Sequence, residues 1–426
     1  MSRLVALGLL AALMFAFGCG GTSNSTPVGT GGGGGGGGNA QNAATITVDA
    51  GPSGLGFVSS DVAFVTVTVC VPGTTNCQNI DHVAVDTGSS GLRILKSGSV
   101  PLTVPLVQEG NLAECYQFVS SFTWGPVMMA DVKIAGETAS NIPIQVIGDS
   151  TTNSGFPVIP TACQNSVPPS VCAPEPCASD TLNTLGANGL LGVDSMIQDC
   201  GPTCASSTSV GLYYSCPSAS SCAPTTVPVN QQVPNPVAEF ASDNNGVLLE
   251  LPAISSASGQ ATATGTMFFG IGTQSNNGLG NATIFHVDQF GNFTTVYNNV
   301  SYPGSFLDSG SNGIFFLTTA LTGMPDCGGG NTGFYCPAST TSFTATNQGT
   351  TGTSNSVTFQ AANVNNLPAA NTAFNDLTGE NALCFVNATT MAPCFDWGLS
   401  FFFGRNVYTA IEGQNTPAGT GPYWAY

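Results

Sequence analysis

One short pattern occurs twice in this chain, once in each half, and constrains the fold more than any other feature. The first copy reads Val83-Ala84-Val85-Asp86-Thr87-Gly88-Ser89-Ser90-Gly91 and the second reads Ser305-Phe306-Leu307-Asp308-Ser309-Gly310-Ser311-Asn312-Gly313. In both, an apolar strand ends at an aspartate, and a hydroxyl residue, a glycine and a serine follow. Such a turn can arise once by chance, but two copies with matched flanks indicate that the chain contains two halves built alike.

Each copy also has a later partner in which two large apolar residues precede a glycine. Leu190-Leu191-Gly192 follows the first copy and Phe402-Phe403-Gly404 follows the second. The order of strand, aspartate and apolar partner is therefore the same in both halves. This order predicts a pseudo-twofold relation between them.

The remaining sequence is typical of an all-β protein, with many short β-branched stretches between turn signals. Pro72-Gly73 predicts a hairpin turn between strands at 62–69 and 82–85, and no helix longer than a few turns is expected. The aromatic run Phe401-Phe402-Phe403 is interpreted as a core strand. Other strands are predicted at 45–48, 116–122, 127–134, 142–147, 246–251, 266–272, 282–287, 305–308, 399–404 and 407–412.

These motifs and their order resemble those of the pepsin-like aspartic peptidases, an all-β family with two pseudo-twofold-related lobes around a central cleft. The resemblance runs from about residue 45 to about residue 412. It includes an entry hairpin at 64–86 and a closing strand segment at 402–411. More narrowly, the chain resembles a group of uncharacterised bacterial lipoproteins that carry the same motifs.

The resemblance implies that Asp86 and Asp308 face each other as the catalytic pair of an endopeptidase. Two close carboxyl groups cannot both ionise cheaply, so they share a proton. The ionised one activates a water molecule and the protonated one polarises the scissile carbonyl. An extended polypeptide substrate is implied, and no metal or other cofactor is expected.

The resemblance also assigns supporting roles to the residues that follow each aspartate. Thr87 and Ser309 are expected to bond across the interface between the lobes. Ser89 and Ser311 are expected to donate to the outer carboxylate oxygens. Gly88 and Gly310 are expected to let the backbone turn tightly beside each carboxylate.

One departure from the family concerns the cover of the cleft. Arg93 stands where the family usually has a tryptophan that supports a tyrosine on a flap. Tyr116 and Trp124 are the candidates for the flap residue. An alternative to the peptidase is therefore a catalytically inactive binding or inhibitor protein on the same scaffold.

The N-terminus is typical of an exported lipoprotein. Arg3, the apolar stretch at 4–17 and Gly18-Cys19-Gly20 predict a signal peptide at 1–18 and a lipidated Cys19, with ordinary signal-peptidase cleavage as the alternative. We expect the protein in the bacterial cell envelope, anchored in the outer membrane, or secreted. The predicted organisation is a lipid-bearing Gly-rich linker at 19–44, an N-terminal lobe at 45–240 with a Cys/Pro-rich insertion at about 153–236, and a C-terminal lobe at 241–426.

The cysteines agree with export. There are 15, and lipidation of Cys19 leaves an even set for disulfide bonds. Short loops predict pairs between Cys70 and Cys77, Cys327 and Cys336, and Cys384 and Cys394. The other eight cannot be paired from sequence, and zinc binding by Cys172/Cys177 and Cys200/Cys204 is a competing interpretation.

The negative charge of the chain limits the classes of partner that it can bind. Only 5 residues are Lys or Arg and the net charge is −18, so nucleic acid and anionic lipid surfaces are unfavourable partners. We expect a monomer that contacts the membrane only through its lipid, and one that tolerates acid.

A serine hydrolase would need His82 or His286 as its base, and no nucleophile elbow accompanies them. Asp194, Asp199 and Asp288 are interpreted as solvated or turn carboxylates.

Overall fold

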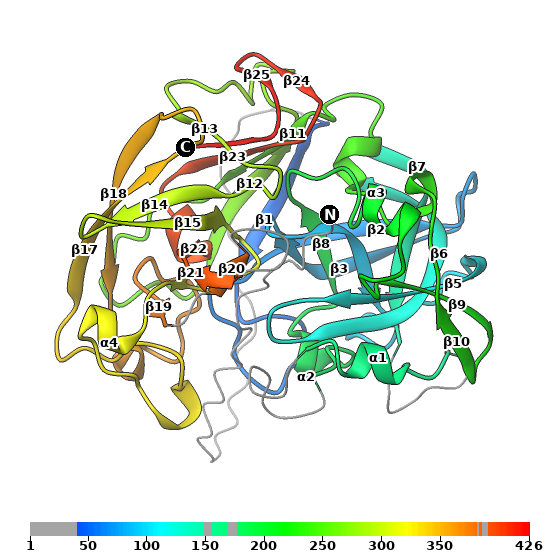
Figure 1. The fold of residues 1–426 in the computed structure, drawn as a ribbon, viewed down its shortest axis with the longest axis horizontal. Helices are drawn as coiled ribbons and strands as arrows, with labels where there is room; N and C mark the ends of the chain where they lie inside the picture. Colours follow the sequence, from blue (N-terminus) through cyan, green and yellow to red (C-terminus); the bar gives the residue numbers. More distant parts are fainter. Residues whose placement is uncertain (1–40, 149–155, 168–176, 381–382, 386–390) are drawn as a thin grey trace, which may run out of the picture.

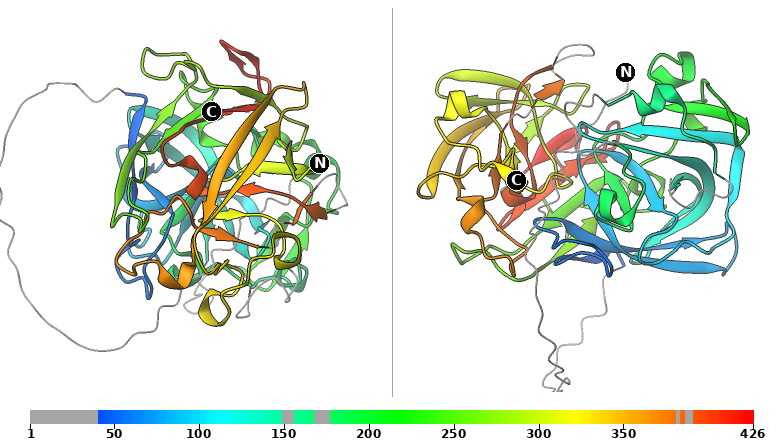
Figure 2. Two further views of the ribbon diagram at one scale, coloured as in Figure 1. Left: turned by 90° about the vertical axis from the view of Figure 1, so that its left-hand side faces the viewer. Right: turned by 90° about the horizontal axis from the view of Figure 1, so that it is seen from below.

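The computed structural model describes residues 41–148, 156–167, 177–380, 383–385 and 391–426. Two β-rich halves lie side by side, one formed mainly by residues before about 240 and the other by the later residues (Figure 1; Figure 2, right view). The all-β, two-lobed fold that the resemblance implies is confirmed. None of the helices within these ranges is long and apolar enough to cross a membrane.

A 15-stranded sheet runs through both halves. β1 (Ala43–Val48) joins them, because it pairs with β2 (Ala63–Cys70) on one side and with β12 (Ala263–Phe269) on the other. An additional pairing between β2 and β6 (Phe122–Ile134) closes the strands from β6 to β2 into a barrel. In spatial order the strands are β10 (Ser221–Pro224), β9 (Tyr213–Ser218), β5 (Val107–Gln117), β6 (Phe122–Ile134), β7 (Glu137–Ile147), β4 (Ser90–Leu95), β8 (Gly189–Val193), β3 (Cys77–Asp86), β2 (Ala63–Cys70), β1 (Ala43–Val48), β12 (Ala263–Phe269), β11 (Gly246–Glu250), β23 (Asn406–Ala410), β26 (Tyr423–Ala425) and β13 (Ile284–His286).

A 7-stranded sheet completes the second half. Its order is β18 (Ser354–Ala361), β17 (Thr341–Gln348), β14 (Phe293–Tyr297), β15 (Val300–Leu307), β22 (Asp396–Trp397), β16 (Ile314–Phe315) and β19 (Thr378–Gly379). Two small hairpins pair β20 (Leu383–Phe385) with β21 (Met391–Pro393) and β24 (Asn415–Thr416) with β25 (Gly419–Thr420). The helices are α1 (Thr161–Gln164), α2 (Leu182–Leu185), α3 (Pro202–Ser206), α4 (Thr319–Thr322) and α5 (Leu399–Phe402), with single 3₁₀ turns at Val229–Gln231, Pro236–Glu239, Gly329–Asn331 and Val364–Asn366.

Two local predictions are wrong. The strand predicted at 116–122 contains the turn of a hairpin, because β5 ends at Gln117 and β6 begins at Phe122. The strand predicted at 399–404 is mostly the single helical turn α5. Phe401, Phe402 and Phe403 are buried there as expected. A continuous apolar run reports burial but not whether the chain is helical or extended, which explains the second error.

The three local disulfides are confirmed: Cys70–Cys77, Cys327–Cys336 and Cys384–Cys394. Three further bonds are Cys115–Cys163, Cys200–Cys204 and Cys216–Cys222, and Cys177 is also disulfide-bonded. The Cys200 and Cys204 thiols are therefore not free to bind zinc. Cys19 and Cys172 lie outside the described residues.

A buried carboxyl group ties the two halves together beside β1. Asp61 accepts hydrogen bonds from the Ser400 hydroxyl at 2.6 Å and from the Phe374 backbone at 2.7 Å, and it has no solvent exposure. Burial raises the pKa of Asp61 well above its usual value, against the two hydrogen bonds that lower it. A carboxyl group with a raised pKa stabilises the fold at acid pH, and this contribution is lost as pH rises through the folded-state pKa.

The thermal unfolding midpoint of the wild type is expected to fall as pH rises from about 4 to about 8. We therefore predict that this fall is smaller in Asp61→Asn than in the wild type. The amide resembles the protonated acid, and Asn tolerates the positive φ of 50° at this position. Thermal unfolding at several pH values measures the effect, with the exposed Glu250→Gln as the control. An unchanged pH dependence in Asp61→Asn would show that this group does not couple folding to pH.

Candidate active site

The first aspartate motif lies in a loop that three strands hold. β3 ends at Asp86 and runs parallel to β8, with Asp86 opposite Gly192. β4 begins at Ser90 and runs antiparallel to the same strand. The predicted partner Leu190-Leu191-Gly192 is therefore the strand that supports the loop.

The second motif has the same arrangement, but its partner is not the predicted one. β15 ends at Leu307, just before Asp308, and runs parallel to β22, while β16 runs antiparallel to β22. The supporting segment is thus Asp396-Trp397-Gly398, whereas Phe402-Phe403-Gly404 begins at the last residue of α5. The segment does not match the expected pattern of two apolar residues before a glycine, because its first residue is Asp396.

Four hydrogen bonds join the two loops across the boundary between the halves. Thr87 Oγ1 donates to the Leu307 carbonyl at 3.3 Å and accepts from the Ser309 backbone at 2.9 Å. Ser309 Oγ donates to the Val85 carbonyl at 2.7 Å and accepts from the Thr87 backbone at 3.1 Å. The contacts are reciprocal, so each loop holds the other in register.

The two carboxyl groups meet at this junction and interact directly with each other. A Cβ atom built on Gly310 would lie 2.6 Å from Asp86 Oδ1 and 3.0 Å from Asp308 Oδ1, so both oxygens are close to one point. A Cβ atom on Gly88 would lie 2.7 Å from the Asp308 carboxyl carbon. Neither glycine has a positive φ. The structure therefore requires glycine here for the close approach of the carboxyl groups, and not for a tight turn.

Each carboxyl group has two local polar contacts. Gly88 N donates to Asp86 Oδ1 at 2.8 Å, and Ser89 Oγ donates to Asp86 Oδ2. Gly310 N donates to Asp308 Oδ1 at 2.8 Å. Ser311 Oγ lies 2.9 Å from Asp308 Oδ2. These bonds orient the two acids alike, with one oxygen of each held by a backbone amide and the other by a serine.

Both acids are fully buried and both are difficult to ionise. Burial raises the pKa of Asp86, although the hydrogen bonds from Ser89 and Gly88 oppose the rise. Burial raises the pKa of Asp308 well above its usual value, and the negative charge of Asp86 raises it further. The pair can therefore hold one proton between its members.

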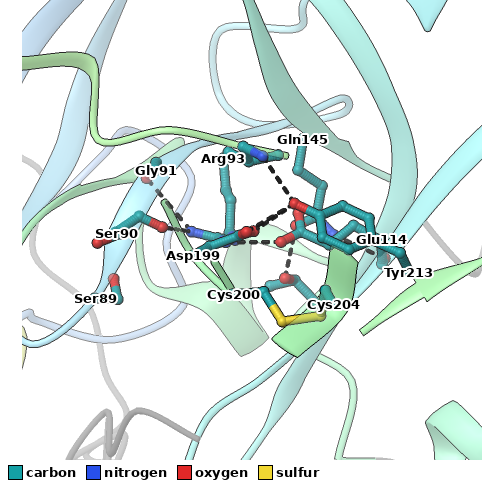
Figure 3. A network of polar contacts seen from close by, with 12 residues as sticks. Ser89, Ser90, Gly91, Arg93, Glu114, Gln145, Asp199, Cys200, Cys204 and Tyr213 are labelled. Carbon is teal, nitrogen blue, oxygen red and sulfur yellow. Dashed lines mark hydrogen bonds and ion pairs between the residues drawn. A yellow bond between two sulfur atoms is a disulfide. The ribbon is translucent and has the colours of Figure 1, made fainter. Parts of the chain in front are cut away.

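Arg93 lies in a buried ionic network (Figure 3), and its charge is among those that act on Asp86. Its guanidinium is 2.8 Å from Glu114 Oε1 and 3.3 Å from Asp199 Oδ2, and it donates to the Ser90 carbonyl at 2.7 Å. Burial alone lowers the pKa of Arg93, but the two carboxylates outweigh it and raise the pKa. Tyr213 completes the network, because its hydroxyl donates to Asp199 at 2.7 Å.

The two flap candidates lie on opposite faces of the β5–β6 hairpin. The Arg93 guanidinium lies 3.4 Å from the centre of the Tyr116 ring, a cation–π contact. Burial raises the pKa of Tyr116 well above its usual value, and Asp86 is among the nearby charges that raise it further. Trp124 instead donates to the Pro157 carbonyl at 2.8 Å and packs edge-on against Tyr214. Tyr116 is therefore the candidate on the Asp86 side.

The insertion holds this hairpin along both of its strands. β9 pairs with β5, and the Cys115–Cys163 disulfide links β5 to α1. On the other strand, Phe122 N donates to the Cys177 carbonyl at 2.9 Å and Ser179 N donates to the Phe122 carbonyl at 2.8 Å. The sequence did not predict β9, because its residues lie in a stretch rich in Pro, Ser and Cys.

Several acids have other roles than the sequence suggested. Asp199 is buried rather than solvated. Asp194 is buried too, but it is a turn carboxylate as expected, because it accepts from the Met196 backbone at 2.7 Å as well as from Ser90 Oγ. Asp288 is a turn carboxylate as expected, because it accepts from the Phe290 and Asn292 backbones. The sequence also missed Glu114, which lies in a part of β5 that was not predicted as a strand. His82 Nε2 lies 3.5 Å from Asp49 Oδ1. No serine hydroxyl is among the described contacts of His82, so these contacts do not support a serine hydrolase.

Comparison with known proteins places the chain in a family. Residues 38–426 match the family described as "Protein of unknown function (DUF3443)", so the chain belongs to that family. No curated protein sequence matches the chain significantly. Among solved structures, the crystal structure of aspartic proteinase from Irpex lacteus aligns with a TM-score of 0.47 and 14% sequence identity, over 90% of this chain and 96% of that chain.

Proposed function

We propose that this protein is an aspartic-type endopeptidase that hydrolyses peptide bonds with a water molecule activated between Asp86 and Asp308. The observation that carries the proposal is the contact between two buried carboxyl groups held by matched loops. Their raised pKa values favour a state with one proton on the pair. The ionised acid then serves as the base and the protonated acid as the electrophile.

In this mechanism Asp86 removes a proton from the water as it attacks the scissile carbonyl carbon. Asp308 donates its proton to the carbonyl oxygen, so the tetrahedral intermediate is a neutral diol. Asp86, now protonated, gives that proton to the leaving amine, and Asp308 recovers a proton as the carbonyl re-forms. Thr87 and Ser309 would keep the two acids in register throughout these steps.

We further propose an extended polypeptide as substrate, and export to the bacterial cell envelope with a lipid on Cys19. The disulfide bonds are consistent with an exported protein. The small number of basic residues argues against nucleic acid as a partner. The proposed organisation remains a signal peptide, a Gly-rich tether, and two lobes that meet near residue 240.

The test is degradation of a reduced, carboxymethylated protein between about pH 3 and about pH 7. Asp86→Asn and Asp308→Asn are each expected to lose at least about 1,000-fold in rate, because a paired acid and base act as a unit. Asp288→Asn, a turn carboxylate, is the matched control and is expected to retain activity. Equal rates in all four proteins would reject the catalytic pair.

A binding or inhibitor protein on the same scaffold is the second candidate. Two observations favour it: Asp86 and Asp308 have no solvent exposure, and the insertion holds the β5–β6 hairpin along both strands. A polypeptide can reach the acids only if the residues that bury them move. Folded wild-type protein without activity at any pH, together with capture of an unfolded polypeptide, would support this candidate.

A further inference from the structure

A third carboxyl group breaks the symmetry between the two halves next to the aspartate pair. In the first half, Ala84 on β3 lies opposite Leu190 on β8. In the second half, Phe306 lies opposite Asp396 on β22. Ala84 and Phe306 both precede the motif aspartate by two residues, so Asp396 occupies the place of Leu190. An acid therefore stands where the other half has a leucine.

Asp396 contacts the pair through one hydroxyl group. Ser311 Oγ lies 2.9 Å from Asp308 Oδ2 and 2.7 Å from Asp396 Oδ2. The equivalent Ser89 has a hydrogen bond to Asp86 Oδ2, and no second carboxylate bonds to it among the described residues. A serine hydroxyl carries one proton, so Ser311 can donate to only one of its two carboxylates. The other contact is a hydrogen bond only if that carboxyl group carries a proton of its own.

Among the described residues, no positive charge near Asp396 would favour its ionised form. The residue is 3% exposed, and no described group forms a hydrogen bond with its Oδ1 atom. The charged groups that face it are Asp86, at the end of β3, and Asp308, just after β15. On β16, which packs against its other side, the opposite residue is Phe315. Arg93 acts on Asp86 from within the first half.

We propose that Asp396 is a third member of this site, a positioning residue that shares a proton with Asp308 through Ser311. The inference rests on the proposed function. The shared proton keeps Asp308 in its acid form up to higher pH than the pair of Asp86 and Asp308 would allow alone. It also assigns the roles: Asp308 is the acid and Asp86 the base, because the first half has no equivalent carboxyl group.

The directions of the pKa shifts agree with this arrangement. Burial raises the pKa of Asp396 well above its usual value, against the hydrogen bond from Ser311. Burial and then Asp86 raise the pKa of Asp308, and Asp396 adds to the rise. Without Asp396, the Ser311 hydroxyl would be free to donate to Asp308 and would stabilise its ionised form. The acid form of Asp308 would then be lost at lower pH.

The test compares the pH dependence of kcat/KM in wild type, Asp396→Asn, Asp396→Leu and Asp376→Asn. Both Asp396 variants are expected to lower the pH of the alkaline limb by about one unit or more and to leave the acid limb nearly in place. Asp376→Asn removes another buried carboxyl group of the same half and is expected to leave the alkaline limb unchanged. An alkaline limb at the wild-type pH in both Asp396 variants would overturn the inference.

A second measurement separates this inference from the proposed function, because it needs no activity. The pH dependence of thermal unfolding reports the ionisation of Asp396, whose raised pKa makes the fold less stable as pH rises. Asp396→Asn is nearly isosteric and is expected to reduce this loss at neutral and alkaline pH. An inactive wild type with this change would reject the peptidase and retain the shared proton. No change in the pH dependence of unfolding would reject the shared proton.

Discussion

Replacing Arg93 by methionine is expected to lower the free energy of unfolding by about 3 to 5 kcal/mol at neutral pH. The substitution keeps an unbranched side chain but removes the cation that lies between Glu114 and Asp199. The side chains of Glu114 and Asp199 have no solvent exposure, so neither carboxylate can be hydrated once the cation is removed. The cation–π contact with Tyr116 is lost as well. Chemical denaturation of wild type and variant measures the difference.

The loss should also depend on pH. Burial, and then the charge of Glu114, already hold the pKa of Asp199 well above its usual value, and Arg93 opposes this rise. Once the cation is gone, the buried Asp199 carboxyl group is accommodated at low cost only in its protonated form, so stability falls as pH rises. The destabilisation by Arg93→Met is therefore expected to be smaller near pH 4 than near pH 7, by about 1 kcal/mol or more.

Arg405 supplies the matched control. Its guanidinium lies 4.4 Å from the Phe401 ring, and it also donates to the Phe401 carbonyl, but none of its described contacts is an ion pair with a carboxylate. Arg405→Met is expected to cost only about 1 kcal/mol, because no buried charge is left without a partner. Similar losses in the two variants would mean that the buried ion pairs contribute little.

Removing the Cys115–Cys163 disulfide is expected to have the second large effect. This bond closes a loop with a sequence separation of 48 residues, so its removal by serine substitution should cost about 4 kcal/mol through the entropy of the unfolded chain. It also frees β5 from α1. Amide hydrogen exchange in the β5–β6 hairpin is expected to become faster, because the hairpin then opens without unfolding the rest of the protein.

The Cys216–Cys222 disulfide is the control, because its loop has a sequence separation of only 6 residues. Loop entropy predicts that the corresponding double-serine variant is less destabilised by about 2 kcal/mol. Its exchange rates in the β5–β6 hairpin are expected to stay near those of wild type. Equal destabilisation by the two double-serine variants would argue against the entropic explanation, and unchanged exchange in both would show that the disulfide does not restrain the hairpin.

The motif residues illustrate how much of the candidate site is local. Asp86 and Asp308 were found from sequence because each follows an apolar strand and precedes a fixed order of hydroxyl and glycine residues. The hydrogen bonds within each motif, from Gly88 N to Asp86 for example, span two or three residues. Contacts of this kind depend on the order of neighbouring residues, so they can be predicted from the local sequence. The apolar partner of the first motif was found for the same reason.

The contacts of Arg93 could not be predicted from the sequence. Its substitution for tryptophan was visible, but its partners Glu114 and Asp199 are 21 and 106 residues away. They meet it only because β4 pairs with β7 and β8, and because the insertion folds back against the β5–β6 hairpin. Strand order and register decide such contacts, and a side chain's neighbours across a sheet are not encoded near it in the chain.

Asp396 shows the same limit at the candidate site itself. By itself, the sequence determined that the chain has two halves, that each half has an aspartate motif, and that the class is all-β, because these properties depend on local pattern. The tertiary structure alone decided that Asp396-Trp397-Gly398 supports the second motif and that Ser311 lies between two carboxyl groups. The physical reason is that a buried acid at an apolar position can be recognised only from the groups around it.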